Sequence, residues 1–313
     1  MPNVRACSGL FVLFAAILIA ASFRGDAAVQ SGKDKQVKSP ANEDDSLVRL
    51  SAPIGPDVES AASIFSSAAL QNLRLQTDLN WFFGGKPQRG WELYVPLISE
   101  MIGADEDAPS NGFAMRLSRW QQTNEIEPSG VLDDATLYRM IETFQSRRIK
   151  ERVPPPEDHL LTAPVSDFYD PSRPAELRKV ELRAYMAYKR MVRAACLDPS
   201  LGLNVVAGGE LALTEKYLKI ISAYRSREYQ AELRKNSPGS GRAGLAINSP
   251  HFTGRALDIY VGGTPVSTAY SNRALQVRTP VYRWLVKNAA RFGFHPYFYE
   301  PWHWEYIGGN DER

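Results

Sequence analysis

Residues 249–258 read Ser-Pro-His-Phe-Thr-Gly-Arg-Ala-Leu-Asp, and residues 300–304 read Glu-Pro-Trp-His-Trp. A hydrolytic zinc site needs three nitrogen or oxygen ligands from the protein, an open position for water, and a nearby carboxylate that accepts a proton from that water. The side chains in these two clusters that match the requirements are His251, Asp258, Glu300 and His303. The two clusters therefore predict a catalytic metal site.

The sequence around the candidate ligands is typical of β-strands. Residues 257–261 read Leu-Asp-Ile-Tyr-Val, and the period of two in a strand puts Asp258 and Tyr260 on one face. Residues 302–306 alternate in the same way, so His303 faces the site while aromatic side chains enter the core. We expect each of two strands to present one ligand to a shared cleft.

Two further residues shape the backbone near the predicted site. Gly254 allows the chain to turn, so that the preceding histidine folds back beside Asp258. Glu300 precedes Pro301, which favours extended or turn geometry over a helix. Glu300 is therefore expected to lie beside the metal without having to bind it.

The two clusters resemble the motifs of a known enzyme family. The pattern Ser-x-His-x-x-Gly-x-Ala-x-Asp followed by Glu-x-x-His-Trp is similar to that of the zinc D,D-carboxypeptidases of the VanY type and the related D-alanyl-D-alanine dipeptidases. Other matching pieces follow the order of the family over roughly the C-terminal half of the chain: Ser222-Ala-Tyr-Arg225-Ser226, Gln230, Trp284-Leu285, Asn288-Ala289 and Phe292-Gly293-Phe294. The resemblance implies an α+β zinc peptidase domain with a small antiparallel sheet and flanking helices.

The resemblance also implies roles for individual residues. It assigns the Zn2+ ligands to His251, Asp258 and His303. It makes Glu300 the general base and Arg225 the group that stabilises the oxyanion of the tetrahedral intermediate. The candidate substrate-binding residues are Ser249, Ser226, Gln230 and Tyr260. The sequence is equally compatible with Ser249 acting as a cap of the next turn.

Composition narrows the class of protein but names no partner. The chain has 313 residues, of which 44% are hydrophobic and 23% are charged, so it is long enough for two modest domains after an export segment. The net charge is +2, and no stretch combines a dense basic face with interleaved aromatic residues. A nucleic-acid partner is therefore not expected.

The first residues predict export from the cytoplasm. Residues 1–28 contain Arg5, then an apolar run from Leu10 to Ala21, then small residues, as in a signal peptide. An uncleaved N-terminal membrane anchor is the alternative, and both interpretations place the rest of the chain in the periplasm or cell envelope. If cleavage occurs, Cys196 is the one remaining cysteine, which excludes an intramolecular disulfide and a cysteine-rich structural zinc site.

The region before the peptidase domain divides into a spacer, a helical unit and a linker. Residues 29–78 are rich in Ser, Ala, Lys and Asp with weak periodicity, which predicts a mostly flexible spacer. Residues 79–150 predict three helices, the last of them capped by Asp133. Residues 151–174 carry many prolines and predict a semi-rigid linker, with the zinc peptidase domain at residues 175–313.

The helical unit resembles the small peptidoglycan-binding domains that accompany cell-wall hydrolases. The similarity lies in Arg119-Trp120-Gln121-Gln122 and in Gly130-Val-Leu-Asp133-Asp134-Ala-Thr, which cover about half of the usual pattern. A helical pro-segment or packing module without a sugar contact is the alternative.

Together these features predict an exported, zinc-dependent peptidase that trims peptidoglycan stem peptides. Removal of a terminal D-alanine is the preferred reaction. An L,D-carboxypeptidase or a peptidoglycan endopeptidase on the same scaffold is the alternative, because the zinc chemistry is shared. A non-catalytic cell-wall-binding protein is disfavoured because it would not need Glu300, which is not required to hold the metal.

Overall fold

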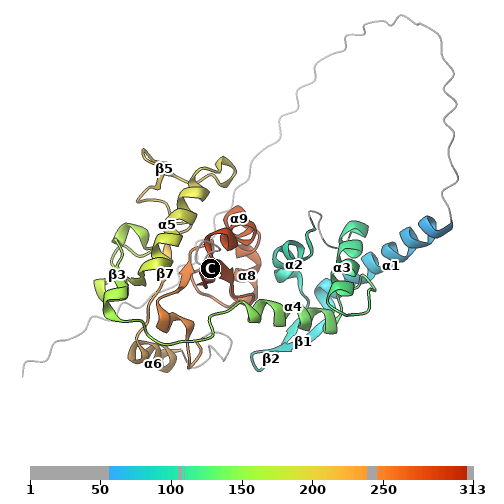
Figure 1. Ribbon diagram of the computed structural model, residues 1–313, viewed down its shortest axis with the longest axis horizontal. Coiled ribbons are helices and arrows are strands. Elements are labelled where there is room, and N and C mark those ends of the chain that lie inside the picture. The colour runs from blue at the N-terminus through green and yellow to red at the C-terminus, as the bar shows by residue number, and fades with distance from the viewer. Residues whose placement is uncertain (1–55, 105–107, 109, 238–244, 309–313) are drawn as a thin grey trace, which may run out of the picture. The chain divides into compact units, whose positions relative to one another are not determined.

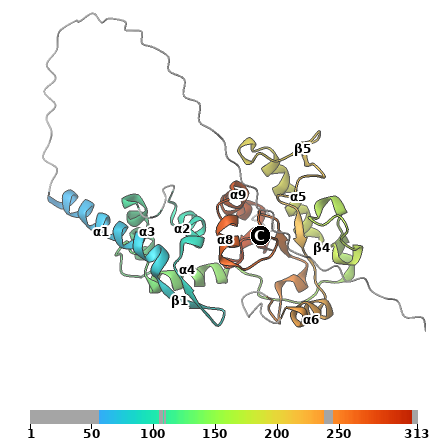
Figure 2. The same ribbon diagram turned by 180° about the vertical axis from the view of Figure 1, so that it is seen from behind.

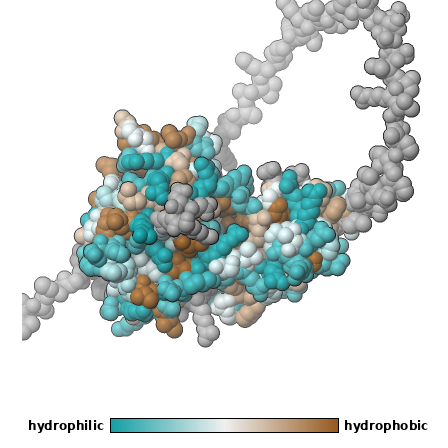
Figure 3. Space-filling model, in the orientation of Figure 1, coloured by the Kyte–Doolittle hydropathy of each residue, from teal (hydrophilic) through white to brown (hydrophobic). Residues whose placement is uncertain are grey.

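A computed structural model describes residues 56–104, 108, 110–237 and 245–308 of the chain (Figure 1). The predicted signal peptide and the predicted spacer up to residue 55 lie outside these residues. No helix in the described ranges is long and apolar enough to cross a membrane. On the face shown in Figure 3, hydrophilic side chains are interspersed with small hydrophobic areas.

The predicted peptidase region, described here for residues 175–237 and 245–308, is built on a four-stranded antiparallel sheet. Its strand order is β7 (Ile220–Ser222), β8 (Ala256–Ile259), β10 (His303–Tyr306) and β9 (Phe294–Pro296). The central strands β8 and β10 are buried along their whole length, and Asp258 is the register partner of His303. The predicted α+β fold with a small antiparallel sheet is confirmed, and its two central strands bring two of the predicted ligands opposite each other.

Helices lie around this sheet (Figures 1 and 2). They are α5 (Leu182–Cys196), α6 (Arg227–Asn236), α8 (Tyr270–Gln276) and α9 (Pro280–Asn288). Thr279 caps α9 by accepting a hydrogen bond from the backbone N–H of Tyr282 at 3.2 Å, and Pro280 occupies the first turn. A separate hairpin pairs β5 (Val205–Val206) with β6 (Glu210–Leu211).

The region N-terminal to the peptidase contains the three predicted helices and two elements that were not predicted. The helices are α2 (Val95–Ile102), α3 (Asn111–Thr123) and α4 (Asp134–Ser146). Asp133 caps α4 as predicted, accepting from the backbone N–H of Thr136 at 2.8 Å. The additional elements are the hairpin β1 (Asn80–Phe83)–β2 (Lys86–Arg89) and the long helix α1 (Pro56–Asp78).

The spacer predicted over residues 29–78 is wrong for residues 56–78, which form α1 and contact α3. Among the side chains of this helix whose burial the structure describes, the buried ones are two alanines, Ala68 and Ala69, and the polar Asn72. The Asn72 amide donates to the carbonyl of Gly130 at 2.9 Å and accepts from the backbone N–H of Leu132 at 2.7 Å. Because these buried side chains are small or polar, the sequence shows no strong hydrophobic periodicity there.

Replacing Asn72 by Ala is expected to destabilise the protein by about 2–3 kcal/mol, because two buried backbone groups lose their partners. Urea unfolding curves of the variant and the parent measure the loss. Gln71→Ala changes the exposed neighbour on the same helix and should shift stability by less than about 0.5 kcal/mol. Equal unfolding midpoints for the two variants would contradict the role of Asn72.

The linker predicted over residues 151–174 is instead built into the peptidase region. It contains β3 (Leu160–Thr162), which pairs with β4 (Lys179–Glu181), and the buried Phe168, which forms a parallel bridge to Ile220 of the central sheet. The prolines therefore shape a tightly attached segment and do not form a hinge. A strand of three residues among prolines leaves no periodic signal in the sequence.

The helical region and the peptidase region share one continuous core. Phe298 of the peptidase region contacts four aromatic rings of the helical region: Trp81, Phe83, Tyr94 and Phe144. Helix α2 also contacts α9, and all described residues belong to one compact unit. At the boundary predicted near residue 150, the chain thus changes from mainly helical to mixed helical and strand structure. The residues on both sides of this boundary pack into the same core.

Candidate active site

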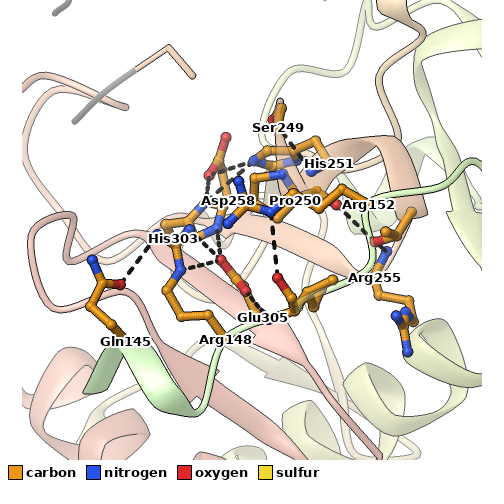
Figure 4. Close-up of polar contacts among 12 residues, drawn as sticks. Gln145, Arg148, Arg152, Ser249, Pro250, His251, Arg255, Asp258, His303 and Glu305 are labelled. Atoms are coloured by element: carbon orange, nitrogen blue, oxygen red, sulfur yellow. Dashed lines mark hydrogen bonds and ion pairs between the residues drawn. The ribbon is translucent and has the colours of Figure 1, made fainter. Parts of the chain in front are cut away.

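Three side chains of the peptidase region form a compact group that could hold a metal ion (Figure 4). The Nε2 atom of His251 lies 3.2 Å from Nδ1 of His303 and 3.3 Å from Oδ1 of Asp258. The same Nδ1 lies 2.9 Å from Oδ1 of Asp258. A tetrahedral zinc ion with bonds of about 2.0–2.1 Å separates its ligand atoms by about 3.3 Å, so this set of two nitrogens and one oxygen fits zinc.

The backbone around His251 explains how it meets the other two side chains. His251 lies in a short 3-10 helix, Pro250–Thr253, that Ser249 caps by accepting from the His251 backbone N–H at 3.3 Å. The helix ends at Gly254, where φ is 67°. A Cβ atom at Gly254 would lie 2.9 Å from the backbone nitrogen of Glu181, so the turn requires glycine.

Hydrogen bonds fix which ring nitrogen of each histidine faces the centre of the group. Nδ1 of His251 lies 2.7 Å from the carbonyl oxygen of Ala223, which can only accept, so this nitrogen carries the proton and Nε2 keeps its lone pair. Nε2 of His303 lies 3.1 Å from Oε1 of Glu305, which leaves Nδ1 as the ligand atom. Metal-binding histidines characteristically have such a partner on the second nitrogen.

The pKa values of the two histidines are shifted in opposite directions. Burial lowers the pKa of His251 to about 4, with the positive charge of Arg225 acting in the same direction. Burial also disfavours the charged form of His303, but hydrogen bonds to Asp258 and Glu305 outweigh it and raise its pKa to about 9. A metal ion bound to the site would displace the proton from His303.

Glu305 is the principal residue of this site that the sequence interpretation missed. It is buried, with 1% of its side chain exposed, and it accepts hydrogen bonds from Arg148 and from the backbone N–H of Ile149. The signal was present in the sequence, since a period of two puts Glu305 on the same strand face as His303.

Glu300 lies beside the metal-ligating group and outside it. It lines the same cavity as His303, and the backbone N–H of His303 donates to the Glu300 carbonyl at 3.0 Å. Burial raises the pKa of the Glu300 carboxyl to about 8, although His303 opposes this rise. A divalent cation in the site would lower that pKa again. The position suits a proton acceptor that does not bind the metal.

Arg225 lies in the site and is paired with a predicted ligand. Its Nη2 contacts Oδ2 of Asp258, the carboxylate oxygen that faces away from the histidines, and its Nε donates to Ser222 Oγ at 2.9 Å. His251 and Arg225 outweigh the effect of burial and hold the pKa of Asp258 well below its usual range. Asp258 is therefore ionised and oriented, as a metal ligand needs to be.

The structure places most of the predicted substrate-binding residues outside the cavity lining. Ser226 caps α6 through the backbone N–H of Tyr229, and Gln230 is buried, accepting from Arg225 and donating to the Ala246 carbonyl. Tyr260 lies one residue beyond β8, and its ring packs on those of Tyr169 and Tyr217. Of these four candidates, Ser249 lines the cavity.

A cavity of about 350 Å³ lies over the metal-ligating group. Its lining is basic on balance, because it includes Arg148, Arg152, Arg173 and Arg225 against the carboxyl groups of Asp258 and Glu300. Arg152 donates to the Asn248 carbonyl at 2.5 Å, and Arg173 donates to the Leu177 carbonyl at 3.0 Å. In the described part of the chain neither of these two arginines pairs with a carboxylate, so both retain donors for an anionic ligand.

Comparison with known proteins gives one family match. Residues 210–309 match the family model described as VanY: D-alanyl-D-alanine carboxypeptidase. This segment is a VanY-type domain. The resemblance read from the sequence motifs is thereby confirmed, and the VanY-type segment contains every predicted metal ligand together with Glu300 and Arg225.

One solved structure shows a weaker likeness. It is a mutant of the vancomycin resistance D,D-pentapeptidase VanY from a VanB-type resistance cassette, in complex with Zn(II). The match covers 51% of this chain and 86% of that chain, at 22% sequence identity and a TM-score of 0.31. No curated protein matches the chain.

Proposed function

We propose that the protein is an exported zinc D,D-carboxypeptidase that removes the terminal D-alanine from peptidoglycan stem peptides. The observation that carries the proposal is that the VanY-type domain holds His251, Asp258 and His303 within zinc-binding distance of one another, in a cavity that Glu300 also lines. A zinc ion bound there would supply a Lewis acid that polarises the scissile carbonyl and acidifies water.

Glu300 has the position and proton affinity of a general base. It accepts the proton of the attacking water and returns it to the leaving amine, which requires a carboxylate that is ionised before the reaction and readily protonated during it. Its burial strengthens the binding of that proton. The Glu300 side chain is buried, which limits the access of bulk water to the transferred proton.

Arg225 contacts Oδ2 of Asp258, the carboxylate oxygen that faces away from the two histidines. Its guanidinium orients the Asp258 carboxylate through Oδ2, and it adds a fixed positive charge to the cavity wall. Such a charge, held in place before the reaction, stabilises an oxyanion that develops at the scissile carbonyl.

The basic cavity lining favours a carboxypeptidase over an endopeptidase. A carboxypeptidase substrate ends in a free carboxylate one residue beyond the scissile bond, whereas an endopeptidase substrate whose backbone continues beyond that residue has an amide there. Arg152 and Arg173 supply donors without a carboxylate partner of their own among the described residues. Arginine binds carboxylates through paired hydrogen bonds, so these residues suit the free terminus.

Export is part of the proposal because the substrate lies outside the cytoplasmic membrane. The apolar run from Leu10 to Ala21, preceded by Arg5, supports a signal peptide or an N-terminal anchor. The proposed location is the periplasm or cell envelope.

Incubation of the full chain with defined muropeptides, followed by mass spectrometry, tests the reaction. We expect the loss of one terminal alanine from stem pentapeptides, its abolition by a strong chelator, and its recovery on addition of Zn2+. Cleavage of tetrapeptides instead would indicate an L,D-carboxypeptidase, and cleavage of cross-linked dimers an endopeptidase. No cleavage of any muropeptide by zinc-loaded protein would overturn the proposal.

A further inference from the structure

Helix α4 ends close to β10, the central strand that carries His303 and Glu305 (Figure 4). Just beyond this helix, Arg148 donates from Nε and Nη2 to Oε1 of Glu305, at 2.8 and 2.5 Å. The backbone N–H of Ile149 donates to Oε2 of the same carboxylate at 2.7 Å. Both oxygens of Glu305 are therefore held by the segment that joins the helical region to the peptidase region.

Glu305 in turn holds the ring of His303. Its Oε1 lies 3.1 Å from Nε2 of His303, and the opposite ring nitrogen, Nδ1, is the atom that faces Asp258 and His251. The hydrogen-bonded connection from Arg148 to the metal-ligating group thus runs through one carboxylate, that of Glu305.

Burial and ring contacts hold the side chains of Arg148 and Glu305 in place. The side chains of Glu305 and Arg148 are 1% and 15% exposed, so the pair is largely shielded from water. The Arg148 guanidinium also stacks over the ring of Tyr297 at 4.0 Å, and that ring contacts the His303 imidazole edge-on at 5.8 Å. Without Arg148, a buried carboxylate beside His303 would lose its counter-charge.

We propose that Arg148 is a positioning residue for the zinc site, so that the helical region completes the metal centre in addition to any contact it makes with the cell wall. The proposal rests on the zinc site of the proposed function. Arg148 lies outside the segment 210–309 that matches the VanY family, so the family match does not assign it this role. It acts through Glu305 and His303 and touches neither the metal nor the reacting atoms.

The test measures zinc affinity of the full chain by competition with a chromogenic chelator. Arg148→Met releases Glu305, the hydrogen-bond partner of His303, and should weaken zinc binding by up to about 10- to 100-fold, the usual effect of losing such a partner of a metal-binding histidine. Arg147→Met changes the exposed neighbouring arginine and should leave the affinity unchanged. The absorption spectrum of the Co2+-substituted protein should change for the first variant and not for the second.

A merely structural role for Arg148 would give a different pattern. It would lower the melting temperature of the metal-free protein while the folded fraction kept the zinc affinity of the parent, and that result would overturn the proposal. If Arg148→Met does not fold, Arg148→Lys keeps the charge but cannot reproduce both hydrogen bonds and the stacking. Zinc affinity of this lysine variant equal to that of the parent would overturn the proposal as well.

Glu305→Gln makes the connection itself testable. In this background Arg148→Met should have little further effect on zinc affinity, because the two residues act in series. Additive losses would overturn the proposed route through Glu305. A parent protein that binds zinc but cleaves no muropeptide would end the proposed function while leaving this inference standing, so the two failures are distinguishable.

Discussion

Glu300→Gln should lower the turnover number by about 10² to 10⁴-fold while leaving zinc content and folding nearly unchanged. The substitution keeps the size of a buried side chain that lines the cavity but removes its ability to accept a proton. Zinc content is expected to persist because Glu300 does not belong to the metal-ligating group. Turnover on a stem pentapeptide and zinc content per chain are the two measurements.

His303→Ala is the matched comparison for Glu300→Gln. Removing one of three ligands should abolish metal binding and activity together. If Glu300→Gln loses zinc as readily as His303→Ala, Glu300 is a ligand and the role of Asp258 has to be revised. If it keeps full turnover, another base carries the reaction.

The sequence was sufficient to predict those features for which the local residue pattern and the side-chain chemistry agree. The alternation in residues 302–306 predicted strand β10 and the orientation of His303, and the glycine at 254 predicted the turn that returns His251. These features depend on neighbours within a few residues, which is the range over which strand and turn preferences act. The α+β fold of the peptidase region was implied by the family resemblance of the motifs that contain these residues.

The sequence was insufficient where a contact joins distant residues. Arg148 and Glu305 are 157 positions apart, and neither has a neighbourhood that suggests the other. Asn72 docks α1 through contacts about 60 positions away. Such pairs are set by tertiary packing, so a single sequence carries no local trace of them.

The expected separation of the helical and peptidase regions was wrong for a related reason. Prolines between residues 151 and 174 are typical of linkers, but here they flank a strand that pairs with β4. The aromatic cluster around Phe298 then joins the two regions through contacts that hydrophobic periodicity within each region cannot reveal.

Deletion of residues 1–150 is therefore expected to abolish zinc binding and to destabilise the remaining chain severely. The deletion removes Arg148 and Ile149, leaving Glu305 buried without a counter-charge, which costs about 3–5 kcal/mol. It also uncovers Phe298, whose ring packs against four aromatic rings of the deleted region. Melting temperature, zinc content and release of D-alanine from stem pentapeptides are the measurements.

A chain that begins at residue 56 is the matched control for this deletion. It keeps helix α1 and every contact named above, so we expect it to melt and bind zinc like the full chain. Its release of D-alanine from soluble pentapeptides should also equal that of the full chain. A chain beginning at residue 151 that did the same would show that the helical region is dispensable to the peptidase, and that the contacts of Arg148 and Phe298 contribute little to its stability.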